Sequence, residues 1–71
     1  MEKKCVLSTD YGYILQYDNH NWIEVHLKSQ LIVKLPLKLI INKNKIKIGS
    51  KVKYIIAVDS ENILYQTIEI L

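Results

Sequence analysis

Apolar and polar residues alternate with a period of two along most of the chain, and turn-forming residues interrupt the alternation at short intervals. This period is typical of β-strands that present one face to a core and the other to water. The pattern predicts strands at Lys4–Ser8, Tyr11–Tyr17, Trp22–Lys28, Lys51–Val58 and Ile63–Ile70. A chain of 71 residues is long enough for one small core. We therefore expect a single domain, 1–71, of the all-β class, built as a small five-stranded antiparallel barrel.

The segment Leu31–Ile41 is the least regular part of the pattern. Its odd positions are all apolar, which favours a strand. Pro36 cannot donate a hydrogen bond to a β-ladder, so it requires a sheet edge or a break. We expect an extra strand that is interrupted at Pro36, or a short helical turn after this residue.

The turn at residues 18–21 sets the register of a hairpin between the second and third predicted strands. Counting outwards from the turn places aromatic and charged residues on one face, in the pairs Tyr17–Trp22, Leu15–Glu24, Tyr13–His26 and Tyr11–Lys28. The opposite face is mostly aliphatic, with the pairs Gln16–Ile23, Ile14–Val25 and Gly12–Leu27. We expect the second face to line the core and the first to be half-exposed.

Charge is segregated along the chain and changes this picture. All residues between Val25 and Val58 that carry a charge are lysines: Lys28, Lys34, Lys38, Lys43, Lys45, Lys47, Lys51 and Lys53. A basic tract in a strand-rich chain indicates a surface for polyanions, of which nucleic acid is the commonest, or else lysines that only keep strand faces soluble. The chain has no arginine, the side chain that reads guanine edges in a bidentate manner. Binding should therefore be salt-sensitive and weakly sequence-specific.

Exposed aromatic rings beside lysines are the arrangement that single-stranded nucleic acid requires, because bases stack on rings while cations follow the phosphates. We expect Tyr11, Tyr13 and Trp22 to stack bases and His26 to contact a base or a sugar. Lys28, Lys51 and Lys53 are expected to neutralise phosphates. The alternative is structural: aromatic pairs stabilise hairpins without a ligand, and a strand histidine often bonds a neighbouring tyrosine.

Other classes of function find little support in the sequence. The single cysteine, Cys5, excludes an internal disulfide and a cysteine-based zinc site. No pairing of a nucleophile with a base, no carboxylate pair and no phosphate-binding loop is evident, so we expect neither an enzyme nor a cofactor or metal. No signal peptide or membrane-spanning run is evident, which predicts a cytoplasmic protein without a membrane partner.

Several short motifs resemble those of S1 RNA-binding domains and cold-shock domains. Thr9–Ile14 (TDYGYI) resembles the aromatic-Gly-aromatic strand of both families, and Ile23–Leu27 resembles their hydrophobic-Val-His strand. Lys47–Tyr54 is similar to their Gly-containing entry into a later strand, and Ala57–Asn62 resembles the S1 hairpin that follows. The resemblance implies an OB-type barrel that binds single-stranded RNA, or DNA, on its second and third strands. It also implies stacking roles for Tyr11 and Tyr13 and a contact role for His26.

A second hypothesis is a protein-interaction module, such as an accessory subunit or a mimic of a cellular S1 domain. It rests on the excess of apolar residues in Leu31–Ile41. If that segment is exposed, it provides a surface for a protein partner or for self-association.

Overall fold

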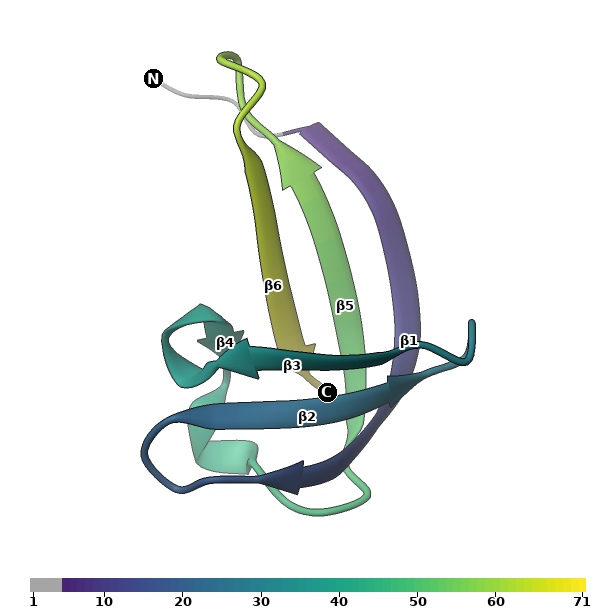
Figure 1. Ribbon diagram of the computed structural model, residues 1–71, viewed down its shortest axis with the longest axis vertical. Coiled ribbons are helices and arrows are strands. Elements are labelled where there is room, and N and C mark those ends of the chain that lie inside the picture. The colour runs from purple at the N-terminus through teal and green to yellow at the C-terminus, as the bar shows by residue number, and fades with distance from the viewer. Residues whose placement is uncertain (1–4) are drawn as a thin grey trace.

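The computed structural model describes residues 5–71, and these form one strongly curled sheet of six strands, a small and partly open β-barrel (Figure 1). The strands are β1 (Cys5–Tyr17), β2 (Trp22–Leu27), β3 (Ile32–Pro36), β4 (Ile40–Ile41), β5 (Lys51–Val58) and β6 (Leu64–Ile70). Their order in the sheet is β3-β2-β1-β5-β6-β4. Neighbouring strands are antiparallel except β4 and β6, which are parallel. The all-β, small-barrel prediction is confirmed, with six strands instead of five.

The first two predicted strands are in fact one. β1 runs for 13 residues and pairs with β5 along Cys5–Tyr13 and with β2 along Gly12–Tyr17. The polar residues Thr9 and Asp10, which fell between the two predicted strands, continue the strand and pair with Ile55 and Tyr54 of β5. The predicted start at Lys4 lies outside the described residues. One long, bent strand therefore joins the two halves of the sheet.

The register of the first hairpin agrees with the prediction only up to Ile14. The pairs Gly12–Leu27, Tyr13–His26 and Ile14–Val25 form as expected. The register then shifts between Ile14 and Gln16, so that Glu24 pairs with Gln16 and Ile23 pairs with Tyr17. The predicted pairs Tyr17–Trp22, Leu15–Glu24 and Gln16–Ile23 are wrong, because a bulge adds one residue to β1 and changes every pair beyond it.

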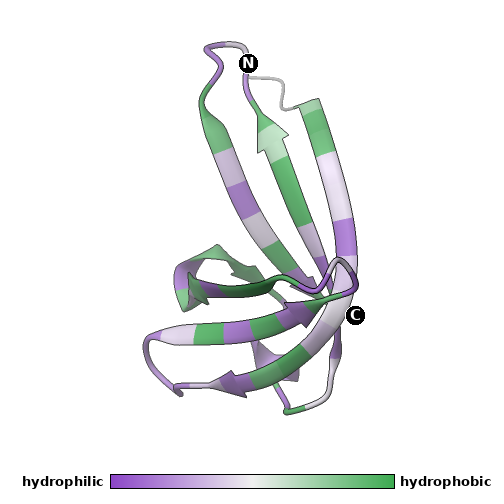
Figure 2. Cartoon of the chain, turned by 45° about the vertical axis from the view of Figure 1, so that its right-hand side comes forward, coloured by the Kyte–Doolittle hydropathy of each residue, from purple (hydrophilic) through white to green (hydrophobic). Residues whose placement is uncertain are grey.

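The core lies on the concave side of the curled sheet. It is a single cluster of aliphatic side chains: Ile14, Ile23, Val25, Leu27, Leu35, Ile40, Val52, Ile68 and Ile70. Figure 2 shows the alternation of hydrophobic and hydrophilic residues along the strands that builds this cluster. On the face predicted to be apolar, the aliphatic residues Ile14, Ile23, Val25 and Leu27 are buried, whereas Gln16, beyond the bulge, is exposed.

The segment Leu31–Ile41 is interrupted at the predicted position. β3 ends at Pro36, a 3₁₀ turn, η1 (Leu37–Leu39), follows, and the chain re-enters the sheet as β4. Most of its apolar residues serve the core: Leu35 and Ile40 are buried, and three more are half-buried and pack against the cluster, namely Val33, Leu37 and Leu39. A second 3₁₀ turn, η2 (Lys43–Lys45), leads towards β5. Among residues 5–71, no helix has the length and apolar character that crossing a membrane requires.

At Gly12 the backbones of β1 and β2 approach each other closely. It is paired with Leu27 of β2 and with Val52 of β5 at the same time. A Cβ atom at this position would lie 2.1 Å from the carbonyl oxygen of His26 and 2.9 Å from the Cα of Leu27. Both are backbone atoms and cannot rotate away, so only glycine fits here.

We expect Gly12→Ala to lower the free energy of unfolding by about 1–3 kcal/mol, since the two strands must separate to admit a methyl group. Urea denaturation followed by circular dichroism measures this loss. Thr9→Ala, on an exposed part of the same strand, is the matched control and should change stability by no more than about 0.5 kcal/mol. Equal stability of the Gly12→Ala variant and the wild type would contradict the close approach.

Candidate nucleic-acid interface

Alternate residues of β1 point outwards, away from the core, and each lies between β2 and β5. Tyr13 pairs with His26 of β2 and with Lys51 of β5. Tyr11 pairs with Lys53 of β5, and its carbonyl oxygen accepts a 2.8 Å hydrogen bond from the backbone N–H of Lys28. Direct partners across a ladder share one face of the sheet. The structure therefore brings these six predicted site residues onto two adjacent rungs of one face.

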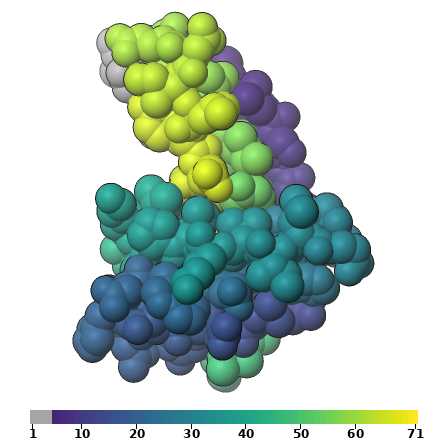
Figure 3. Space-filling view, in the orientation of Figure 1, coloured from purple at the N-terminus to yellow at the C-terminus, as the bar shows by residue number. Residues whose placement is uncertain are grey.

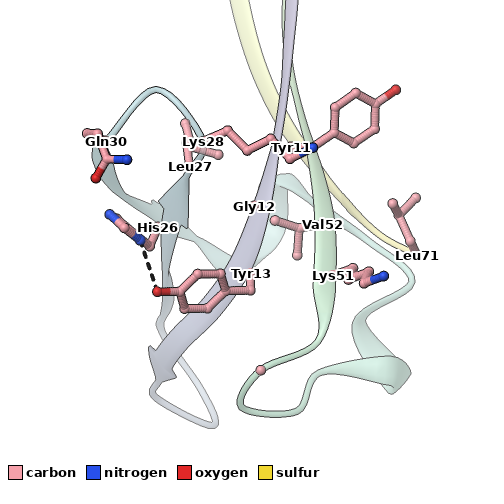
Figure 4. A pocket seen from close by; sticks show the side chains of 11 residues that line it. Tyr11, Gly12, Tyr13, His26, Leu27, Lys28, Gln30, Lys51, Val52 and Leu71 are labelled. Atoms are coloured by element: carbon pink, nitrogen blue, oxygen red, sulfur yellow. Dashed lines mark hydrogen bonds between the residues drawn. The ribbon is translucent and has the colours of Figure 1, made fainter.

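The outward face of these rungs borders an open hollow of about 710 Å³ (Figure 4). The residues that line it come from β1, β2, β5 and the turns beside them: Tyr11, Gly12, Tyr13, His26, Leu27, Lys28, Gln30, Gly49, Lys51, Val52 and Leu71. Five of the seven predicted site residues are in this set. Lys53 lies on the neighbouring rung and does not line the hollow.

The Tyr13 ring is held by His26. The Tyr13 hydroxyl and His26 Nδ1 are 3.0 Å apart and share a hydrogen bond, and their rings meet edge to face at 78° with centroids 5.4 Å apart. The structural alternative considered for His26, a bond to a neighbouring tyrosine, is thus present. Tyr13 nevertheless remains 43% exposed. The contact fixes the direction of the ring while leaving much of its surface open to a ligand.

The Tyr11 ring is equally accessible, at 43% exposure. In Figure 4 it extends over the β5 side of the hollow, whereas Tyr13 extends towards β2 and His26. The two rings therefore diverge and do not cover one another. Each is available to a separate planar group.

Asp10 anchors the turn that carries Lys28 and Gln30. Its carboxylate accepts hydrogen bonds from the backbone N–H of Tyr11, at 2.8 Å, and of Ser29, at 3.4 Å. The Ser29 hydroxyl first, and then the Tyr11 N–H, hold the pKa of Asp10 below its usual value of 3.8. The ionised carboxylate thus joins the turn to the strand that carries both tyrosines.

Trp22 is not part of the hollow. It lies on the same face of β2 as His26 but four residues away, opposite Pro36 of β3. The ammonium group of Lys34 sits 4.0 Å from the centroid of its ring, which is a cation–π contact. The stacking role predicted for Trp22 therefore has a competing intramolecular partner.

Not all of the charged side chains near Tyr11 and Tyr13 are available to a ligand. Lys53 pairs across the sheet with Glu69 of β6, which reduces its local positive field. Glu24, which would repel a phosphate, accepts a 2.7 Å hydrogen bond from the side-chain amide of Gln16. Within residues 5–71, neither Lys28 nor Lys51 has an acidic register partner, and these two lysines line the hollow.

Sequence reasoning assigned no site role to six of the lining residues, namely Gly12, Leu27, Val52, Leu71 and the two turn residues Gln30 and Gly49. Both lie in tight turns and have positive φ angles, 74° and 85°. The Gly49 N–H donates to the Ile14 carbonyl at 2.8 Å, which brings the turn before β5 beside Tyr13. A turn at Gly49 was predictable from its residue type, but its place beside β1 depends on strand pairing between distant parts of the chain.

Residues 5–71 contain no group of three or more His, Cys, Asp or Glu side chains that could hold a metal ion. No family model, curated protein or solved structure matches the chain. Its function is therefore argued from the geometry of the site.

The bond between Asp10 and Ser29 should depend on pH. The folded pKa of Asp10 lies below the unfolded value, so ionisation favours the anchored turn above pH 3.8, and this contribution is lost as the pH falls through the folded pKa. Amide chemical shifts of Ser29 and Gln30 should show this transition in an acid titration. Asp10→Asn should abolish it, whereas Asp18→Asn, in the other turn, should leave it unchanged. Persistence of the Ser29 transition in Asp10→Asn would contradict the assignment.

Proposed function

We propose that the protein binds single-stranded nucleic acid, with RNA preferred over DNA, on the outward face of β1, β2 and β5. The observation that carries the proposal is the pair of exposed rings, Tyr11 and Tyr13, on alternate positions of one strand with lysines on the neighbouring strands. Bases provide planar groups for the rings, and the phosphates between them carry the charge that the lysines neutralise.

The spacing of the two rings suits consecutive nucleotides. Alternate residues of a β-strand are about 6.7 Å apart, which leaves room for one base on each ring of an extended strand. Lys28 and Lys51 flank the rings on opposite sides and can follow the backbone. Since lysine acts as a point charge and arginine is absent, sequence specificity should be weak.

His26 is assigned a contact with a base edge or a sugar hydroxyl. One of its ring nitrogens bonds Tyr13, and Nε2 is left for a ligand. A 2′-hydroxyl, which is both donor and acceptor, is a suitable partner and distinguishes RNA from DNA. We do not assign a stacking role to Trp22, because the ammonium group of Lys34 already contacts its ring.

The motif resemblance to S1 and cold-shock domains supports the same face. The aromatic-Gly-aromatic motif lies on β1, and the Val-His motif lies on β2 directly beside it. The close backbone approach at Gly12 gives the motif a physical role, since the residue between the two tyrosines must lack a side chain.

The alternative function, protein interaction through Leu31–Ile41, loses most of its basis. Five of the apolar residues in that segment are committed to the core or packed against it. Leu31 and Ile32, at 60% and 59% exposure, and Ile41 remain outside. A partner that binds there would need to use these three side chains.

We expect Tyr13→Ala and Tyr11→Ala each to weaken the binding of a short single-stranded RNA by about 5- to 150-fold, the range that corresponds to the loss of one stacked base. Fluorescence anisotropy of labelled oligonucleotides measures the dissociation constants. Trp22→Ala is the matched aromatic control and should have a smaller effect. Wild-type affinity in the Tyr11/Tyr13 double variant would refute the proposed face.

The salt dependence of binding tests the lysines. Each phosphate contact with a single strand contributes about 0.7 to the slope of log affinity against log salt concentration. Lys51→Ala should reduce the slope by about this amount. Lys45→Ala, in η2 and outside the hollow, removes the same charge and should change the slope less. Equal effects of the two substitutions would indicate a diffuse charge effect instead of a defined contact.

A further inference from the structure

The turn that joins β2 to β3 holds a glutamine in a backbone conformation that usually selects glycine. The Gln30 N–H donates to the Leu27 carbonyl at 2.9 Å, and the Leu27 N–H donates to the Leu31 carbonyl at 2.8 Å, so residues 28–30 form a three-residue hairpin loop. The φ angle of Gln30 is 74°. Loops of this kind usually carry glycine at the left-handed position, because a Cβ atom is disfavoured there. The chain thus keeps a long side chain where the backbone favours none.

Bonds to β1 fix the position of this turn. The backbone N–H of Ser29 donates to the Asp10 carboxylate at 3.4 Å, and that of Lys28 donates to the Tyr11 carbonyl at 2.8 Å. In Figure 3 the turn lies at the surface, at the right-hand edge of the wider, teal part of the molecule. The backbone of Gln30 is therefore held at a set place relative to the strand that carries both tyrosines.

The side chain of Gln30 is exposed and lines the hollow. Figure 4 shows it on the same side of β1 as His26. The hydrogen bond that Gln30 donates within the described part of the chain comes from its backbone. The other two glutamines of the chain have side-chain partners: the Gln16 amide donates to Glu24, and Gln66 accepts from a tyrosine hydroxyl, both at 2.7 Å. The carboxamide of Gln30 is thus placed at the hollow with its donor and acceptor open to a ligand.

A carboxamide recognises a base through two adjacent hydrogen bonds, since it presents an N–H donor beside a carbonyl acceptor. Adenine offers the complementary pair on two edges, N6–H with N7 on the Hoogsteen edge and N6–H with N1 on the Watson–Crick edge. The other bases lack such a pair on the Hoogsteen edge, and the contact of glutamine with N6 and N7 of adenine is a standard one. Tyrosine rings stack any base and lysine only donates, so neither side chain makes this distinction.

We propose that Gln30 reads the edge of one base held in the hollow and selects adenine at that position. This inference rests on the proposed function and adds a base preference to it. The preference concerns a single nucleotide, which agrees with weak specificity over the rest of the strand. The positive φ angle also has a reason on this view, because glycine at the same place would relax the turn but remove the group that reads the base.

Anisotropy titrations with two labelled RNA hexamers test the inference, one made of adenosine and the other of purine riboside, which lacks the 6-amino group. The second hexamer keeps the purine rings and the phosphates, so it can still stack and meet the lysines. We expect the wild type to bind the adenosine hexamer about 5-fold more tightly, the lower end of the range for a bidentate base contact. Gln30→Gly should reduce this ratio to about 1, because it removes the amide without straining the turn.

Asn62→Gly is the matched control. Asn62 also has a positive φ angle, 62°, but it lies in the turn between β5 and β6 and does not line the hollow. Both glycine variants should keep the circular dichroism spectrum of the wild type, and Asn62→Gly should keep its preference for adenosine. Equal binding of the two hexamers by the wild type, or an unchanged preference in Gln30→Gly, overturns this inference alone. Failure of the wild type to bind either hexamer overturns the proposed function as well.

Discussion

The fold depends on the close approach of two backbones at Gly12. Here β1 pairs with β2 on one side and β5 on the other, and the His26 carbonyl occupies the space that a side chain would need. In Figure 1, β2 and β3 cross the lower part of the sheet that β1 and β5 form. The core cluster includes Ile14 of β1 and Val25 of β2. Tyr11 and Tyr13, the two neighbours of Gly12, alternate with it along β1 and therefore lie on the opposite face of the strand, where both are 43% exposed.

The fold was predictable as far as period-two patterning reaches. Alternation identified β2, β5 and β6, the break at Pro36 and the buried face of the first hairpin up to Ile14. It failed at the bulge beyond Ile14 and at the polar pair Thr9 and Asp10, which separated two predicted strands but continue β1. A bulge adds a residue without changing composition, and a polar residue in a strand is tolerated where its side chain finds backbone donors, as Asp10 does. Both depend on tertiary neighbours that a local pattern does not contain.

The candidate site was likewise predictable only in part. The pair Tyr13–His26 was predicted by counting from a loop at residues 18–21, and it holds because the bulge beyond Ile14 offsets a one-residue error in the pairs nearest the loop. Lys28 lies beside Tyr11 as expected, through a backbone hydrogen bond. The positions of Lys51 and Lys53 beside the tyrosines come from pairing between β1 and β5, which lie far apart in the sequence. Charge segregation suggested these two lysines but could not place them. Trp22 was assigned to the site because its residue type suits stacking, yet its ring is engaged by Lys34 of β3, a contact that depends on tertiary structure.

The lysines are grouped in space as well as along the chain. The reason is that β5 runs from the barrel, where β1 also pairs with β2, to the exposed end of β1. Its outward row begins with Lys51 and Lys53 and ends with Ile55 and Ala57, while its inward row is apolar throughout. If lysines served only solubility, the exposed first half of β1, residues 5–9, and the strand ends beside it would need them most. They are instead concentrated on the barrel, where the outward face already carries open aromatic rings. This distribution is the one that the polyanion binding proposed for the barrel requires.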